Sequence, residues 1–210
     1  MTSWSAPDVV RQHRRHNLLL TLVMVGVGMT PAWLGPSWLV LPWMVAGVLF
    51  GGPAVYYTWR YAPWMPSPAV EVPRIVTALG LGPGQGFCDL GAGDGRLVVA
   101  VRRATGARCV GIEAAPLQYL VGRLHLALRG DRDTVLRFGD LHRADLSGFD
   151  ALYVWGTAYW VATPAFREHL QRTLKPGARV VSYHHRLHGL RPVRVDDSGV
   201  RPIYVFVPRP

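Results

Sequence analysis

The chain has 210 residues, of which half are hydrophobic and 17% are charged, whereas soluble domains usually carry about 25% charged residues. This length suits one compact domain plus an additional segment. The two cysteines, Cys88 and Cys109, lie in apolar stretches that are typical of strands. This placement argues against a disulfide or a metal site at either position.

The net charge is +10, and Lys175 is the only lysine beside 22 arginines. A basic chain can bind nucleic acid, anionic lipid or an acidic partner. Here the arginines are scattered, and no charged residue occurs in the 44 positions from His16 to Trp59. We therefore expect a membrane partner, and we expect no nucleic acid partner.

Two apolar runs lie within this uncharged stretch. We predict membrane spans over about residues 17–34 and 38–57, joined by a turn near residues 34–37. A spanning helix needs about 17 to 25 apolar residues, so each run is long enough. The sequence thus predicts two transmembrane helices that form a hairpin.

The flanks of the hairpin predict its orientation. Arg14 and Arg15 precede the first run and Arg60 follows the second, which places both ends on the cytoplasmic side. Pro42 and Pro53 interrupt the second run, so one span plus a re-entrant piece is an open alternative. In either case the protein is expected to be anchored in a membrane, with the following domain in the cytoplasm.

A proline-rich connector follows the hairpin and is expected to be stiff. Its prolines are Pro63, Pro66, Pro68 and Pro73. We place the boundary here, with residues 1–62 forming the basic flank and hairpin and residues 63–210 forming the second domain.

In the second domain, helical and strand patterns alternate. Helices are predicted over residues 72–79, 96–104, 116–128 and 164–174, and strands over 86–90, 108–112, 134–138, 151–155, 178–183, 192–195 and 202–207. Such alternation predicts an α/β domain with a mostly parallel sheet. The last two strands flank a tight turn at residues 196–199, so the end of the chain should add an antiparallel strand.

A glycine-rich loop follows the first of these strands. Gly91, Gly93 and Gly95 have the spacing G-x-G-x-G, whereas dinucleotide sites need a third glycine at the position of Arg96. Asp89 precedes the loop and suits a ligand with a positive ammonium group better than it suits a pyrophosphate. The loop therefore favours S-adenosylmethionine over a dinucleotide.

Two further acids end the next strands. Glu113 closes the second strand, where a carboxylate can accept both hydroxyls of a ribose. Asp140 closes the third strand and could accept a hydrogen bond from an adenine amino group. Ligands of such sheets bind beyond the carboxyl ends of the strands, so the three acids should meet there.

These motifs resemble those of class I S-adenosylmethionine-dependent methyltransferases. The resemblance is carried by residues 87–96, by Gly111-Ile112-Glu113, by Gly139-Asp140-Leu141 and by residues 174–178. It implies a Rossmann-like fold with a seven-stranded, mostly parallel sheet whose last strand is antiparallel. It also implies cofactor contacts at Asp89, Gly91, Ala92, Gly93, Glu113, Asp140 and Leu141.

The finer resemblance is to membrane-anchored protein-lysine methyltransferases that act on the ATP synthase c subunit and the adenine nucleotide translocase, with their bacterial relatives. It is carried by the hydrophobic N-terminus, by Met65-Pro66-Ser67-Pro68 and by the glycine loop. It implies a protein substrate. Trp155 and Tyr159, after the fourth strand, are candidates for aromatic walls around the lysine, with ordinary core packing as the alternative.

Other readings stay open at this point. A lipid or a small hydrophobic molecule could be the methyl acceptor, and a non-catalytic membrane-anchored binding module could keep the same fold. His184, His185 and His188 have no cysteine or carboxylate close in sequence, so we expect no metal.

Overall fold

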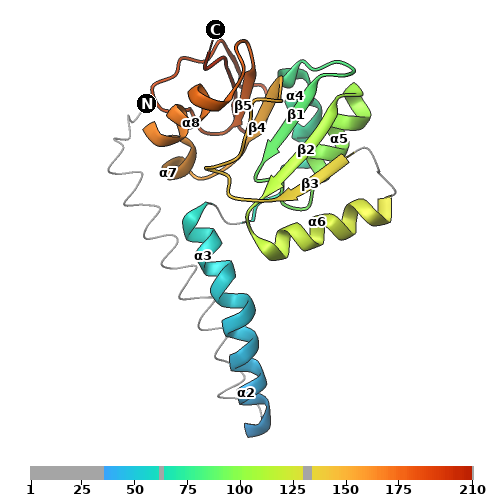
Figure 1. Ribbon diagram of the computed structural model, residues 1–210, viewed down its shortest axis with the longest axis vertical. Helices are drawn as coiled ribbons and strands as arrows, with labels where there is room; N and C mark the ends of the chain where they lie inside the picture. Colours follow the sequence, from blue (N-terminus) through green and yellow to red (C-terminus); the bar gives the residue numbers. More distant parts are fainter. Residues whose placement is uncertain (1–35, 62–63, 130–133, 210) are drawn as a thin grey trace. The chain divides into compact units, whose positions relative to one another are not determined.

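The structure, a computed structural model, describes residues 36–61, 64–129 and 134–209. The chain divides into two compact units, Met1–Pro63 and Trp64–Pro210 (Figure 1). The predicted first span, residues 17–34, lies outside the described residues.

The described part of the first unit is helical but is not one continuous α-helix. Helix α2 (Ser37–Ala46) passes into a π-helical turn, η1 (Gly47–Gly51), and then into α3 (Gly52–Arg60). Pro42 lies inside α2, and Pro53 lies in the first turn of α3. No helix among residues 36–61, 64–129 and 134–209 is both long and apolar enough to cross a membrane. The predicted span over residues 38–57 is therefore not supported.

The second unit contains a seven-stranded sheet with the order β3-β2-β1-β4-β5-β7-β6 (Figure 1). Its strands are β1 (Gly86–Leu90), β2 (Arg108–Glu113), β3 (Thr134–Phe138), β4 (Ala151–Val154), β5 (Arg179–Tyr183), β6 (Arg194–Asp196) and β7 (Ile203–Phe206). The first five strands are parallel, and β7 runs antiparallel to both of its neighbours. This confirms the predicted α/β fold with an antiparallel last strand.

The helices of this unit are η2 (Ala69–Glu71), α4 (Val72–Leu79), α5 (Arg96–Thr105), α6 (Pro116–Arg129), α7 (Ala158–Val161) and α8 (Pro164–Thr173). The chain moves from β1 through α5 and α6 to β3, whereas α8 joins β4 to β5 on the other side of β1. Because such crossovers are right-handed, α8 covers the face opposite to α5 and α6. The order also reverses at β1 and β4, which is where ligands of these sheets bind.

The core on the α4–α5 face is built from alternate residues of the central strands. Phe87 and Tyr153 point into it, together with Ile75 of α4 and Val98 of α5. Side chains alternate between the faces of a sheet, so this register also places Asp89 on the same face. Asp89 lies opposite Tyr153 in the pairing of β1 with β4, at the end of the strands that leads to the glycine loop.

Candidate active site at the carboxyl edge of the sheet

The glycine loop between β1 and α5 turns through left-handed backbone conformations. Gly91, Gly93 and Gly95 have φ values of 94°, 54° and 73°, which other residues adopt only at a cost. The N–H groups of Gly91 and Ala92 both donate to the Ile112 carbonyl, at 2.9 and 3.1 Å. These two hydrogen bonds hold the glycine loop against the carboxyl end of β2.

Two further glycines let neighbouring elements come close to this loop. A Cβ atom on Gly111 of β2 would lie 2.6 Å from Ala92 Cβ and 2.6 Å from Leu136 Cδ1. A Cβ atom on Gly122 of α6 would lie 2.8 Å from the carbonyl oxygen of Gly93. All three distances are shorter than real Cβ contacts, so the close packing around the loop needs glycine at both positions.

Glu113 holds the loop in place from the end of β2. Its carboxylate accepts from the N–H of Gly93 at 2.7 Å and from the N–H of Ala115 at 2.8 Å. Burial raises the pKa of Glu113, although these hydrogen bonds oppose the shift. Each carboxylate oxygen can accept more than one hydrogen bond, so Glu113 can still accept from ribose hydroxyls.

Asp89 is a buried acid with a strongly raised pKa. Its side chain is 4% exposed, and none of the described residues pairs with its carboxylate by a hydrogen bond or an ion pair. Burial first, and then the charges of Glu113 and Asp94, raise the pKa of Asp89 to about 8. Asp94 itself forms an ion pair with Arg96. Asp89 and Glu113 thus form a buried acidic pair that would be stabilised by a cationic ligand.

The raised pKa of Asp89 predicts how stability depends on pH without a ligand. The folded protein holds a proton on Asp89 up to about pH 8, whereas the unfolded chain releases it near its ordinary pKa of 3.8. Stability should therefore fall as the pH rises from about 4 to about 8. Asp89→Asn should raise the unfolding temperature near pH 8 but change it little near pH 4. Thermal melts across this range would check this, and equal shifts at both ends would contradict it.

Asp140 and Leu141, at the end of β3, also lie at this edge. Asp140 accepts from the backbone N–H of His142 at 2.8 Å, and its carboxylate is half-buried. Leu141 is buried, and its Cδ1 atom lies 3.8 Å from where a Cβ atom on Gly91 would be. The end of β3 is thus in contact with the glycine loop. All seven residues predicted to contact the cofactor lie at the ends of β1, β2 and β3.

The two predicted catalytic aromatics lie after β4. Trp155 is half-buried, packs against the core and contacts Tyr183 edge-on, with 5.0 Å between ring centroids. This contact supports the packing alternative for Trp155. Tyr159 lies in α7, and its side chain is outside the described residues. A catalytic role for either residue stays a prediction.

The histidines after β5 lie at the same edge of the sheet. His184 has a φ of 75°, and its ring lies 4.3 Å from that of His185. A non-glycine residue in this region of backbone space stores strain, which is common near functional sites. In the described parts of the chain, no group of three or more His, Cys, Asp or Glu residues could hold a metal ion.

Part of the proline-rich connector also reaches this edge. We call residues 64–71 the entry segment. The Trp64 indole lies against the glycine loop, with its Nε1 3.0 Å from where a Cβ atom on Gly93 would be. Ser67 and Tyr153 share a buried hydrogen bond of 3.0 Å between their hydroxyls. The proline pattern predicted a stiff segment here but gave no signal for these contacts.

The far end of the entry segment is tied to the last two strands. Glu71 is 2% exposed and accepts from the N–H of Val200 at 2.7 Å. Arg74 pairs with Glu71 and also with Asp196 of β6, the latter at 2.8 Å. These bonds hold the entry segment across the carboxyl edge.

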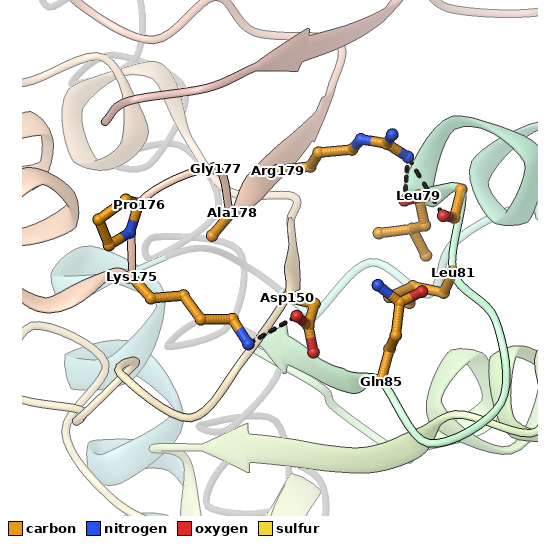
Figure 2. A pocket seen from close by; sticks show the side chains of 10 residues that line it. Leu79, Leu81, Gln85, Asp150, Lys175, Pro176, Gly177, Ala178 and Arg179 are labelled. Atoms are coloured by element: carbon orange, nitrogen blue, oxygen red, sulfur yellow. Dashed lines mark hydrogen bonds and ion pairs between the residues drawn. The ribbon is translucent and has the colours of Figure 1, made fainter. Parts of the chain in front are cut away.

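A polar pocket lies at the opposite edge, around the amino ends of β1, β4 and β5 (Figure 2). Lys175 forms an ion pair with Asp150 at 2.6 Å, and Arg179 donates to the carbonyls of Leu79 and Gly80, both at 3.2 Å (Figure 2). These charged groups are partnered within the pocket itself, and the pocket is remote from the glycine loop. We therefore assign it no part in the reaction.

Comparison with known proteins identifies related domains. Residues 89–194 match the model of the ANTKMT methyltransferase domain. The chain is 25% identical over 154 residues to a protein-lysine N-methyltransferase of Saccharolobus islandicus. The aligned region covers 70% of this chain and 94% of that protein. The chain is also 29% identical over 147 residues to the adenine nucleotide translocase lysine N-methyltransferase of Mus musculus. This aligned region covers 69% of this chain and 62% of that protein.

A solved structure is also similar. The crystal structure of an RNA methyltransferase from Salinibacter ruber, in complex with S-adenosyl-L-homocysteine, has a TM-score of 0.65 and 29% identity. The similarity covers 69% of this chain and 94% of that one.

The site described here fits S-adenosylmethionine. This cofactor carries positive charge on its ammonium and sulfonium groups, which suits the buried acids Asp89 and Glu113. The chain belongs to the family of ANTKMT methyltransferase domains, and it is an S-adenosylmethionine-dependent methyltransferase.

Proposed function

We propose that this enzyme methylates the side-chain amine of lysine in a protein substrate. The observation that carries the proposal is the match over 94% of the length of a protein-lysine N-methyltransferase. This chain therefore has counterparts for nearly all residues of that protein-lysine N-methyltransferase. The connections at the carboxyl edge are also short, and residues 139–150 between β3 and β4 contain no helix. No inserted subdomain within the described residues covers the end of β4, which suits a macromolecular acceptor.

The three acids have separate roles in this proposal. Asp89 would hold the ammonium group of the cofactor, Glu113 the ribose hydroxyls and Asp140 the adenine amino group. When bound, S-adenosylmethionine supplies an activated methyl group on a sulfonium. Methylation also requires a neutral amine, and a site with little water favours the neutral form of lysine. Trp155 and Tyr159 stay our candidates for the walls of that site.

We also propose that the enzyme works at a membrane, with its methyltransferase domain on the cytoplasmic side. The uncharged stretch from His16 to Trp59 and the arginines on both sides of it support this location. A membrane protein would then be the natural substrate.

Transfer of a radiolabelled methyl group tests the proposal. The full-length enzyme should label protein in a membrane fraction, and hydrolysis of that protein should release methylated lysine. Asp89→Asn serves as the inactive control. Label found only in lipid would replace the proposal with the lipid alternative. Label found only in RNA would favour an RNA substrate, for which the Salinibacter ruber relative and the net charge of +10 are the supporting observations.

Trp64 gives a separate prediction about cofactor binding. Because its indole lies against Gly93, Trp64→Ala should remove one wall of the site. An aromatic contact of about 1 kcal/mol corresponds to roughly a fivefold rise in the Kd for S-adenosylmethionine. Isothermal titration would measure this, and Trp64→Phe should restore most of the affinity. If the alanine variant and the natural enzyme bound S-adenosylmethionine with equal affinity, Trp64 would not be part of the cofactor site.

A further inference from the structure

Helix α6 has large apolar side chains on the side that faces away from the sheet. We call five of these residues the outer stripe: Leu117 is 53% exposed, Leu120 62%, Val121 38%, Leu124 60% and Leu128 78%. The inner side of the helix is also apolar, with Gly122 and Leu126 buried against the rest of the domain. Helix α6 is therefore apolar on two opposite faces.

The outer stripe is continuous along the helix. At 3.6 residues per turn, its members fall within an arc of about 100°, roughly opposite the direction of Gly122 and Leu126. A surface helix normally presents polar residues on this side, and contiguous exposed apolar patches mark contact sites. Helix α6 lies beside β3, the edge strand of the sheet (Figure 1).

Among the described residues, the charges beside the outer stripe are basic. Helix α6 contains no Asp or Glu, and its exposed Arg123 and Arg129 lie on either side of the stripe, where Arg123 also donates to the Tyr119 hydroxyl at 3.0 Å. Phe138, at the end of the neighbouring strand β3, lies on the α6 side of the sheet and is 54% exposed, with its ring centroid 5.5 Å from that of Tyr119. A leucine-rich face bordered by arginine suits the surface of an anionic bilayer, because the side chains enter the lipid and the guanidinium groups reach the phosphates.

We propose that the outer stripe lies in the headgroup region of an anionic membrane. This contact is distinct from the uncharged N-terminal stretch, and it would determine which side of the methyltransferase domain faces the lipid. An acidic protein groove or a second copy of the chain is an alternative occupant. Neither is favoured here, because the stripe is one unbroken convex helix face with basic borders.

The inner side of α6 connects this contact to the active site. His125 Nδ1 lies 2.8 Å from the carbonyl oxygen of Asp94, and Gly122 lies against the Gly93 carbonyl. Only the thickness of α6, about 10 Å with its side chains, would then separate the glycine loop from the lipid. The cofactor would be held close to the membrane surface, where the amine of a membrane protein could reach it.

An environment-sensitive fluorophore on the full-length protein tests the proposal. Cys88 and Cys109 are buried, so a single surface cysteine can be labelled selectively. The test position is Leu120→Cys in the outer stripe, and the matched control is Val200→Cys, which is 68% exposed in the turn between β6 and β7. Unchanged cofactor affinity in both labelled variants would show that each is folded.

We expect a blue shift at position 120, and quenching by lipid-borne quenchers, in vesicles that contain phosphatidylglycerol. Both signals should be at least severalfold weaker in phosphatidylcholine alone, and both should be absent at position 200. No signal at position 120 in anionic vesicles would overturn the proposal. A blue shift at position 120 without vesicles would also overturn it, because the stripe would then be covered by protein.

Discussion

Replacing Asp89 by asparagine should weaken the binding of S-adenosylmethionine by about a hundredfold, because truncating one partner of a buried charged pair costs about 2–5 kcal/mol. Asparagine has nearly the same shape as aspartate but no charge. The change should therefore remove the attraction for the ammonium group while leaving the glycine loop intact. Isothermal titration of both proteins would measure the loss.

The pH dependence distinguishes a direct ionic role from a structural one. Without ligand, Asp89 is protonated below about pH 8, so binding of a cationic cofactor should release a proton there. Affinity should rise with pH up to about 8 in the natural enzyme and lose this dependence in Asp89→Asn. Asp197→Asn, at an exposed acid in the turn after β6, is the control and should bind normally. If Asp89→Asn bound the cofactor as tightly as this control does, the assignment of Asp89 would be wrong.

Gly122→Ala should destabilise the domain and disturb the cofactor site together. The new Cβ atom would lie 2.6 Å from Leu136 Cδ2 and 2.8 Å from the backbone oxygen of Gly93. The leucine can rotate away, but the backbone of the glycine loop has to move. Overpacking of this kind costs about 1–3 kcal/mol, against a gain of about 1 kcal/mol in helix propensity. We expect a lower unfolding temperature and a raised Kd for the cofactor.

Gly148→Ala is the matched control for this substitution. A Cβ atom on Gly148 would have no heavy atom within 4 Å, and this glycine lies in the connection before β4. Thermal melts and cofactor titrations on both variants would separate the steric effect from a general glycine-to-alanine effect. A Gly122→Ala variant with natural affinity would show that α6 and the glycine loop do not pack as described.

Sequence patterns were sufficient for the order of the seven strands and of the four longer helices in the second unit, but they did not predict the short helices η2 and α7. The predicted strands over residues 86–90 and 134–138 match β1 and β3, because short apolar runs bounded by glycine and polar residues are local signals. The spacing of Gly91, Gly93 and Gly95 likewise located a tight turn after β1, and cofactor binding at this turn stays a prediction. The predicted span over residues 38–57 was not supported, because none of the helices in the described part of the chain is both long and apolar enough to cross a membrane.

Contacts between distant residues were decided only by the tertiary structure. Glu113 was expected to bind ribose, but its bond to the Gly93 N–H depends on how β2 lies beside the glycine loop. Trp64 reaches Gly93 because the entry segment crosses the sheet edge, which no local pattern specifies.

For helix α6, the sequence determined that the helix forms, and the tertiary structure decided which of its faces is buried. Its apolar residues follow a helical period on two opposite faces, so the sequence by itself determined that a helix forms. It could not determine which face is buried, because periodicity records where apolar side chains lie but not what they pack against. Only the position of α6 against β3 and the glycine loop left the outer stripe exposed.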